Sequence, residues 1–440
     1  MCVACGGPRC AHAPAPSLSH TAPAPHTPPP HLRADGDEHV TGCANGTNYC
    51  PSDLPAERLS DRNTTTQAIA TLQRMAAWAA ANGTSFFLGV GMHFPHQAWA
   101  TQAGMADFYP SPAALAPPLH ASSPVGAPDV AFTAELDGQD HLALDFGNAH
   151  LGNRTRDATL PANATGLQSY PVGSPGNNTV PPFFAQYLRL GYYTAVTTSD
   201  EHFGMVMQAL EAAGLSDSTI VVLFGDHGWQ LGEHSLWGKH TNFDTSVHVP
   251  LLVRVPGKAA SAGARTETVV ELLDLYRTLS ALAGLPEPEA GVEGKDFSAV
   301  FDDPSKTLFS EAYAQYSRCP GERNFPTVHS LPDWALNNCE DVPVHNITYM
   351  GYTVRTLDYR LTQWYRWDGQ ACVAQWGAPP YATELYNHSG HTNPGDFDGW
   401  ENENIAAAAP GVVAELGAKL LARFRTAGTG CPADQPGVRD

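Results

Sequence analysis

The sequence predicts an α/β protein with a mostly parallel sheet covered by helices on both faces, followed by a small C-terminal α+β subdomain. Apolar runs of strand length recur at residues 85–92, 218–224 and 249–257, and segments with helical spacing of apolar residues separate them. Each run is apolar throughout, which is typical of parallel strands buried on both faces. A chain of 440 residues is also long enough for a large core and two unequal domains.

The first 36 residues are expected to form a disordered tail. Pro, Ala and His dominate this segment, and such a composition cannot bury a core. The pattern becomes globular from about Asp53.

A helix followed by a strand opens the globular part. Residues 61–82 carry apolar side chains at helical spacing, Asp and Thr near the start are fit to cap the helix, and Gly83 ends it. The apolar run 85–92 then predicts a buried strand that leads to His93 and His96.

The middle of the chain continues the alternation of helices and strands after a loop-rich segment at 97–180. The predicted elements are one long helix or two over 181–213 with Gly214 as the stop, strands at 218–224 and 249–257, and an amphipathic helix over 267–283 closed by Gly284. This order is typical of a mostly parallel α/β sheet.

The composition changes after about residue 305. Residues 346–369 hold two aromatic, partly alternating runs that predict an antiparallel hairpin, and residues 411–428 predict a closing helix. We therefore divide the chain into a tail at 1–36, an α/β domain at 37–304 and a C-terminal subdomain at 305–440.

The charge balance excludes some classes of partner. The chain has 44 acidic against 24 basic residues, a formal net charge of −20, and no Lys/Arg cluster that would form a nucleic-acid-binding face. An acidic surface repels anions at long range, so an anionic substrate must be held by local cations. No run approaches the roughly eighteen uninterrupted apolar residues that a membrane span needs.

Nine cysteines leave several pairings open. Cys2, Cys5 and Cys10 could bind zinc, but no second C-x-x-C follows at the spacing of a zinc finger. Cys43 and Cys50 flank a short Gly/Asn-rich stretch, which favours a small disulfide loop. Two later cysteines could pair likewise, Cys319 and Cys339.

Eight N-x-[S/T] triplets favour the secretory pathway, with the chain extracellular or lysosomal. They begin at Asn45, Asn63, Asn82, Asn153, Asn163, Asn177, Asn346 and Asn387. The N-terminus has neither the basic nor the apolar region of a signal peptide, and a missing upstream segment would reconcile the two observations.

The stretch FGDHGWQLGEHSLWGKH, residues 224–240, carries the strongest chemical signal. Asp226 and His227 stand where the strand 218–224 ends, and ligands gather at the carboxyl ends of parallel strands. Asp offers hard oxygen and His offers nitrogen to a divalent cation. Lys239 returns after a loop, and a metal ion together with a lysine is what a tetrahedral dianion such as sulfate or phosphate requires.

Structural roles are the alternatives for the same residues. An Asp at the end of a strand is often a helix N-cap, a lone Lys is often a surface residue, and single histidines are often structural. Trp229 and Trp237 are better explained as packing residues than as ligand contacts.

From about Asp37 to Ala408 the sequence resembles the sulfatase family, and most of all its iduronate-2-sulfatase-like members. The resemblance is carried by the runs FFLGVGMHFPH, SVHVPLLVRVPG, MGYTVRTLDYRLTQW and TELYNH, and above all by the long segment 191–244. It implies the fold shared with alkaline phosphatase, a partial sulfatase catalytic domain at 37–304, and a sulfated glycan or small sulfate ester as the partner.

The resemblance also implies roles for single residues. Asp226 and His227 match the family's late pair of metal ligands, the metal usually being Ca²⁺, and Lys239 matches the sulfate-binding lysine. The family's K-x-H motif falls on residues 94–96, so that His96 matches the substrate-contacting histidine while Phe94 replaces the lysine. The remaining candidate for a substrate contact is His93.

The family's nucleophile motif is missing from the sequence. Members carry an early strand ending in Asp-Asp and then C-x-P-x-R or S-x-P-x-R, whose Cys or Ser becomes formylglycine, and no Cys or Ser here fits. We expect a sulfatase-type hydrolase that is catalytically crippled, or part of a longer chain, with no catalytic residue assigned. The alternatives are a secreted glycoprotein that binds sulfated glycans without turnover, and a phosphoester hydrolase on the same fold.

Overall fold

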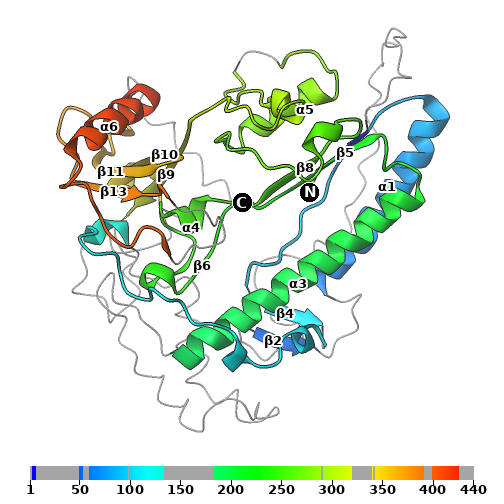
Figure 1. Ribbon diagram of the computed structural model, residues 1–440, viewed down its shortest axis with the longest axis horizontal. Helices are drawn as coiled ribbons and strands as arrows, with labels where there is room; N and C mark the ends of the chain where they lie inside the picture. Colours follow the sequence, from blue (N-terminus) through cyan, green and yellow to red (C-terminus); the bar gives the residue numbers. More distant parts are fainter. Residues whose placement is uncertain are drawn as a thin grey trace. The chain divides into compact units, whose positions relative to one another are not determined.

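The computed structural model describes residues 2–5, 49–52, 59–97, 99–102, 104–132, 182–288, 291–319, 339, 342–390 and 399–425 (Figure 1). The chain divides into two compact units. The first comprises residues 1–108, 191–222 and 253–257, and the second comprises 109–190, 223–252 and 258–440. The predicted domain boundaries after residues 36 and 304 stay predictions.

A four-stranded sheet in the order β3-β1-β5-β8 is the centre of the first unit. Its strands are β1 (Cys2–Cys5), β3 (Phe87–Gly89), β5 (Thr219–Phe224) and β8 (Leu251–Arg254). β1 runs antiparallel to both of its neighbours, β3 and β5, so it departs from the mostly parallel sheet that the sequence predicts, while β3 and β5 run in the same direction as each other. The apolar runs 85–92, 218–224 and 249–257 each contain one of the predicted strands.

The prediction of a disordered tail is wrong for residues 2–5, which form β1. The run Cys-Val-Ala-Cys has no proline and contains a β-branched residue, so it can join a sheet although the composition of the whole segment is biased. Residues 6–36 lie outside the described residues, as do Cys10 and Cys43.

Two long helices belong to this α/β architecture, α1 (Ser60–Asn82) and α3 (Pro182–Ala212). Gly83 ends α1 in the left-handed conformation at φ 64°, and its N–H bonds the carbonyl of Ala79. The sequence left open one long helix or two over residues 181–213, and the structure has one uninterrupted helix. Leu72 of α1, Leu210 of α3 and Val221 of β5 pack in one core cluster, as their spacing predicts.

The second unit contains an antiparallel sheet in the order β12-β11-β10-β9, with β13 paired to β11. Its strands are β9 (Glu311–Arg318), β10 (Tyr349–Thr356), β11 (Tyr359–Asp368), β12 (Val373–Ala374) and β13 (Ala382–Asn387). The predicted hairpin is confirmed, because β10 and β11 pair antiparallel with Val354 opposite Leu361. The predicted closing helix is α6 (Pro410–Phe424), which packs Leu416 and Leu420 on this sheet.

The remaining elements are short. They are β2 (Tyr49–Ser52) paired parallel with β4 (Trp99–Gln102), β6 (Gln230–Leu231), β7 (Trp237–Gly238), α4 (Asp244–Val247) and α5 (Asp274–Leu282). The 3-10 turns are η2 (Met105–Phe108), η3 (Pro112–Ala114), η4 (Asp129–Ala131), η7 (Glu233–Ser235), η8 (Ala259–Ser261), η9 (Ser298–Phe301) and η10 (Val344–Asn346).

Two local predictions have clear outcomes. Helix α5 begins at Asp274, later than the predicted start at 267, and its first residue fixes this position because the Asp274 carboxylate accepts the backbone N–H groups of Glu271 and Lys295. The possible pairing of Cys319 with Cys339 is confirmed as a disulfide with a Cα–Cα distance of 5.9 Å.

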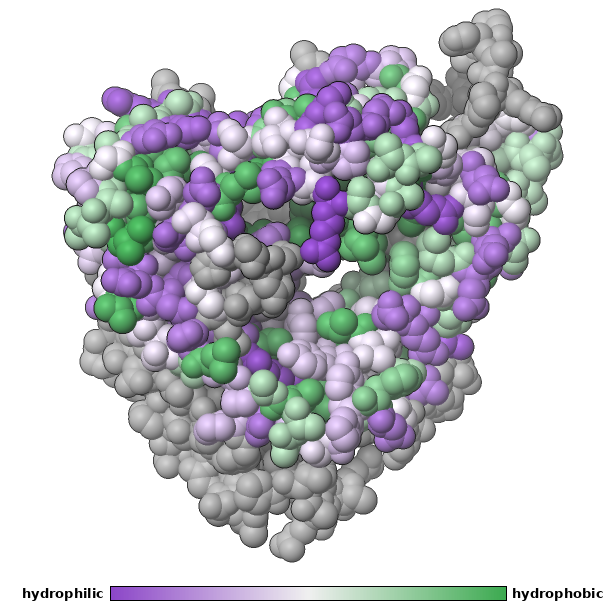
Figure 2. Space-filling view, viewed as in Figure 1, coloured by the Kyte–Doolittle hydropathy of each residue, from purple (hydrophilic) through white to green (hydrophobic). Residues whose placement is uncertain are grey.

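Hydrophilic and hydrophobic side chains alternate over the face drawn in Figure 2. None of the helices that the structure describes is both long and apolar enough to cross a bilayer.

Candidate anion-binding site

A short hairpin between β5 and α4 builds the candidate site in the second unit. Strands β6 and β7 pair antiparallel, with Gln230 opposite Gly238 and Leu231 opposite Trp237. Since position 238 faces position 230, the chain that leaves β7 returns beside the residues that enter β6. Lys239 is thereby brought next to His227, although twelve residues separate them in the sequence.

The turn of this hairpin has unusual, left-handed backbone angles. Gly232 adopts φ 101°, and a Cβ there would lie 2.8 Å from both the Pro118 and Trp237 side chains. His234 and Ser235 are also left-handed, with φ 57° and 63°, a conformation that non-glycine residues rarely adopt.

A buried arginine holds the turn in place. Arg189 donates from Nε to the Leu231 carbonyl at 3.0 Å and from Nη2 to Glu233 Oε1 at 2.6 Å. The other oxygen of Glu233 accepts the Leu231 N–H at 2.6 Å. These contacts stabilise a strained backbone that would otherwise relax.

Three predicted residues meet at the open end of the hairpin. Lys239 Nζ lies 3.0 Å from His227 Nε2, and Asp226 Oδ2 lies 3.6 Å from the same nitrogen. His227 Nδ1 lies 2.8 Å from the Gly228 carbonyl oxygen. Because a carbonyl can only accept, Nδ1 carries the hydrogen, and Nε2 presents its lone pair to the Lys239 ammonium group.

Gly228 is required by close approach to α4. A Cβ at this position would lie 2.1 Å from the Thr245 carbonyl oxygen, and the Gly228 N–H donates to the Ser246 carbonyl at 2.7 Å. Gly228 is not among the glycines with positive φ, so the close approach to α4 is what requires a glycine there. Any larger residue at 228 would displace the site from α4.

His93 and His96 lie in the first unit, after β3. The backbone N–H groups of His93 and Phe94 each donate to the carboxylate of Asp61 at 2.8 Å. The imidazoles of the two histidines are 5.0 Å apart, centre to centre, and both bond the Gln97 carbonyl oxygen. Asp61 therefore fixes this loop and does not cap α1, and the roles of the two histidines toward an anion stay predictions.

Asp226 and His227 fit a divalent cation in donor type. The Asp226 side chain is 85% exposed, and the His227 ring is oriented by its bond to a backbone carbonyl, as the rings of metal-binding histidines usually are. They supply two ligand atoms, whereas calcium takes about six to eight oxygens.

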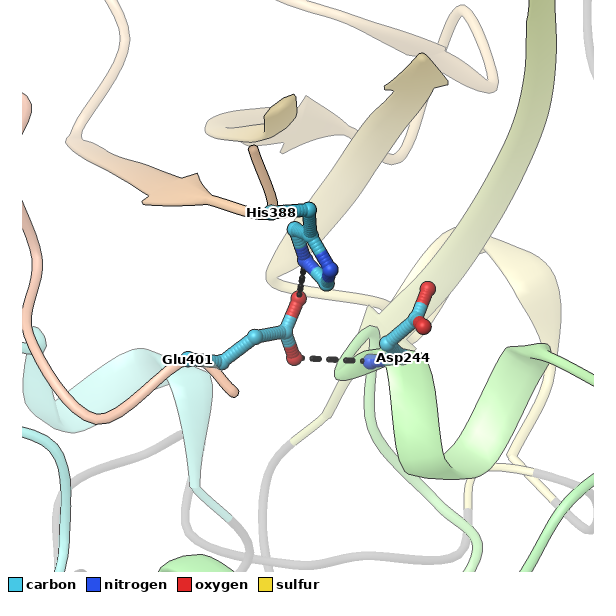
Figure 3. Close-up of side chains that lie close together, drawn as sticks. All are labelled: Asp244, His388 and Glu401. Carbon is cyan, nitrogen blue, oxygen red and sulfur yellow. Dashed lines mark hydrogen bonds and ion pairs between the residues drawn. The ribbon is translucent and has the colours of Figure 1, made fainter. Parts of the chain in front are cut away.

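A second cluster was not found by sequence reasoning. One ligand atom each of Asp244, His388 and Glu401 lies within 4.8 Å of the others, and all three residues are buried. Figure 3 shows Glu401 between His388 and the backbone nitrogen of Asp244, with the Asp244 carboxylate turned away from it. The signal available in the sequence was two arginines, Arg355 and Arg360, within aromatic strand segments that otherwise predict burial.

The second cluster is an ion-pair network. Arg355 Nε donates to Asp244 Oδ1 at 3.0 Å, and Arg360 Nε donates to Glu401 Oε1. Burial disfavours the ionised form of Glu401, but the charge of Arg360 and the hydrogen bond from His388 outweigh it and hold the pKa of Glu401 well below its usual range. Two guanidinium groups in direct contact with the carboxylates would repel a metal ion placed there.

Comparison with known proteins decides the family. Residues 32–285, more than half of the chain, match the sequence profile of the family described as Sulfatase. The chain belongs to the sulfatase family. Members of this family generally bind a metal ion.

Several curated sulfatases are similar over long stretches. Mouse (Mus musculus) iduronate 2-sulfatase is 29% identical over 428 residues, covering 84% of this chain and 69% of that protein. The human (Homo sapiens) iduronate 2-sulfatase is 29% identical over 422 residues, with 84% and 70% covered. Human arylsulfatase K is 36% identical over 163 residues, which are 37% of this chain and 27% of that protein.

Solved structures support the same fold. The phosphonate monoester hydrolase from Silicibacter pomeroyi superposes with a TM-score of 0.55 at 22% identity, covering 93% of this chain and 68% of that one. A sulfatase from Bacteroides fragilis gives a TM-score of 0.50 at 16% identity, with 87% and 64% covered. The predicted α/β class of the alkaline-phosphatase and sulfatase type is thereby confirmed.

Proposed function

We propose that this sulfatase-family chain is a sulfatase-type hydrolase whose site binds the sulfate ester of a glycan, of the iduronate 2-sulfate type. The observation that carries the proposal is the 3.0 Å contact between Lys239 Nζ and His227 Nε2, with the Asp226 carboxylate beside them. The relatives with the longest matches quoted above are iduronate 2-sulfatases. In a chain of net charge −20, such a local cation is what an anionic ester requires.

Lys239 supplies the positive charge of the site. Its ammonium group has three hydrogens, so it can donate to His227 Nε2 and to a sulfate oxygen at the same time. The side chain is partly buried, so the charge is less screened than that of a surface lysine. As negative charge builds on the sulfate oxygens during hydrolysis, Lys239 stabilises it.

His227 orients the site through its fixed tautomer. The bond from Nδ1 to the Gly228 carbonyl prevents the ring from turning and keeps the lone pair of Nε2 facing Lys239. Asp226 and His227 would hold a divalent cation, Ca²⁺ by resemblance, which supplies further charge neutralisation when bound. His227 would bind the cation through the lone pair of Nε2, and Lys239 would then direct all its hydrogens to the anion instead of that nitrogen. His96 and His93 stay proposed substrate contacts, by resemblance.

Turnover is expected to be weak or absent in the chain with the printed sequence. No Cys or Ser of the sequence falls in a C-x-P-x-R or S-x-P-x-R motif, so the covalent route through formylglycine has no nucleophile there. Binding of sulfate does not need that nucleophile.

A secretory location, extracellular or lysosomal, completes the proposal. Eight sequons and the Cys319–Cys339 disulfide support an oxidising, glycosylating compartment. Among the sequon asparagines that the structure describes, Asn82, Asn346 and Asn387 are exposed.

The test measures binding and hydrolysis separately on the purified full chain. Inorganic sulfate is titrated at low ionic strength by calorimetry, and release of sulfate is followed from a disaccharide that carries an iduronate 2-sulfate, from an aryl sulfate and from an aryl phosphate. We expect sulfate to bind, and Lys239→Met to weaken that binding by about tenfold or more.

Lys258→Met is the matched control, because Lys258 pairs with Asp302 at the surface of the same unit. Equal sulfate affinity in wild type and Lys239→Met would overturn the anion site. Turnover of the aryl phosphate in preference to the aryl sulfate would overturn the assignment to sulfate.

A further inference from the structure

We infer that Asp244, held by Arg355 and Glu401, is a positioning residue for the anion site. Its backbone and side chain fix helix α4, and α4 is the surface on which Gly228, and through it His227, is placed. This inference rests on the proposed sulfate-binding role of Lys239 and His227. The residues of the network come from α4, β10, β11, the segment after β13 and the segment before α6, all in the second unit.

Asp244 is bonded through three different atoms. Its backbone N–H donates to Glu401 Oε2 at 2.8 Å, Oδ1 accepts from Arg355 Nε at 3.0 Å, and Oδ2 lies 3.2 Å from His248 Nδ1. Figure 3 shows the backbone contact and the different direction of the carboxylate. A residue held in three directions fixes the start of α4 in position and in orientation.

His388 ties the two ion pairs together. Its Nδ1 lies 3.1 Å from Arg355 Nη2, and its Nε2 lies 2.9 Å from Glu401 Oε1. Because a guanidinium group can only donate, Nδ1 accepts and Nε2 carries the hydrogen that Glu401 receives. The histidine is therefore neutral, and it joins the Asp244–Arg355 pair to the Arg360–Glu401 pair.

The network is balanced in charge and is held under backbone strain. Two carboxylates face two guanidinium groups, and the Asp244 and Glu401 side chains are 3% and 1% exposed. Glu401 adopts φ 58°, which a glutamate does only where surrounding contacts require it. A rigid, buried cluster in which both carboxylates are bonded is a suitable support for a more exposed site.

Helix α4 contacts the anion site through the two residues that follow Asp244, Thr245 and Ser246. The Ser246 carbonyl accepts the Gly228 N–H at 2.7 Å, and Gly228 packs so closely on Thr245 that no Cβ fits between them. Thr241 Oγ1 and Ser246 Oγ lie 2.8 Å apart, and the Thr241 N–H donates to the Lys239 carbonyl at 2.7 Å. The backbones on both sides of the His227–Lys239 contact are thus fixed to α4.

The experiment compares sulfate affinity with thermal stability in Asp244→Ala and in the milder Asp244→Asn. Inorganic sulfate is titrated into the full chain well below the melting temperature of each variant. The histidine ring signals are recorded by NMR on chain labelled with ¹³C-histidine, and His227→Gln assigns the signal of His227. We expect Asp244→Ala to weaken sulfate affinity by about tenfold and to shift the His227 signal, with Asp244→Asn intermediate.

Glu384→Gln is the matched control. Glu384 is also a buried carboxyl group of the second unit, but its hydrogen bonds are to Trp364 Nε1 and the Tyr386 hydroxyl. The Glu384→Gln variant should have a lower melting temperature and an unchanged sulfate affinity. If both Asp244 variants lose stability yet bind sulfate as the wild type does, the positioning role is wrong while the anion site stands. If the wild type itself does not bind sulfate, the proposed function fails first.

Discussion

The hairpin site and the buried network use the same kinds of residue in opposite ways. At the hairpin, Asp226 is 85% exposed and its carboxylate has room for another ligand. In the network, Glu401 is 1% exposed and both of its oxygens are occupied. The difference teaches that a cluster of acids and histidines marks a binding site only where charge and hydrogen-bonding capacity remain available, whereas a closed cluster marks a support.

The largest loss of stability should come from removing a carboxylate of the buried network. In Glu401→Ala, Arg360 is left buried without its carboxylate, and we expect a loss of about 3–5 kcal/mol in the free energy of unfolding, measured by urea denaturation. Glu311→Ala, which removes the partner of Lys419 in a partly exposed pair of the same unit, should cost no more than about 1 kcal/mol. Equal losses in the two variants would show that burial does not distinguish the two pairs.

A smaller effect is expected at the junction between the two regions. Gly228→Ala places a methyl group against the Thr245 carbonyl oxygen, so we expect a loss of about 1–3 kcal/mol in the free energy of unfolding, together with weaker sulfate binding. Gly377→Ala is the control, since nothing lies within 4 Å of the added Cβ there. Undiminished sulfate affinity in Gly228→Ala would separate the site from α4 and contradict the coupling of the two regions.

The smallest effect concerns His248 at the rim of the network. Its hydrogen bond to Asp244 raises the pKa of His248 above 6.5, and burial opposes this shift only in part. A raised folded-state pKa means that the stabilisation is fully present below pH 6.5 and is lost as the pH rises through the folded-state value. Because the His248 side chain is 47% exposed, we expect its hydrogen bond to Asp244 to contribute less than about 1 kcal/mol to the free energy of unfolding.

Urea unfolding of the wild type and His248→Gln at pH 5.5 and pH 9 measures this contribution. The difference in stability between the two proteins should be larger at the acid pH. A difference that grows toward the alkaline pH would mean that His248 is held neutral by its surroundings.

Local patterns made most of the fold predictable from the sequence. Apolar spacing predicted α1, α3, β5, β8 and the β10–β11 hairpin, because each of these elements buries a face that its own residues define. β1 was missed because four residues inside a biased segment carry too little pattern. The start of α5 was missed because the carboxylate of Asp274, and not the apolar periodicity, decides where the helix begins.

The candidate site divides along the same line. Asp226, His227 and Lys239 were found because they lie within one short segment after a predicted strand. The buried network around Asp244 was not found, because Asp244 lies 111 residues from Arg355 and 157 residues from Glu401. Contacts of that separation depend on tertiary packing, which a single sequence does not reveal.

The placement of Asp226, His227 and Lys239 within a single compact unit has a consequence for how the site can vary. A pocket shared among distant segments would lose its shape whenever any one contributor changed. Because the three residues lie in one unit, we expect substitutions in the first unit to leave their mutual contacts intact. We therefore expect the proposed sulfate binding to be kept or lost independently of turnover.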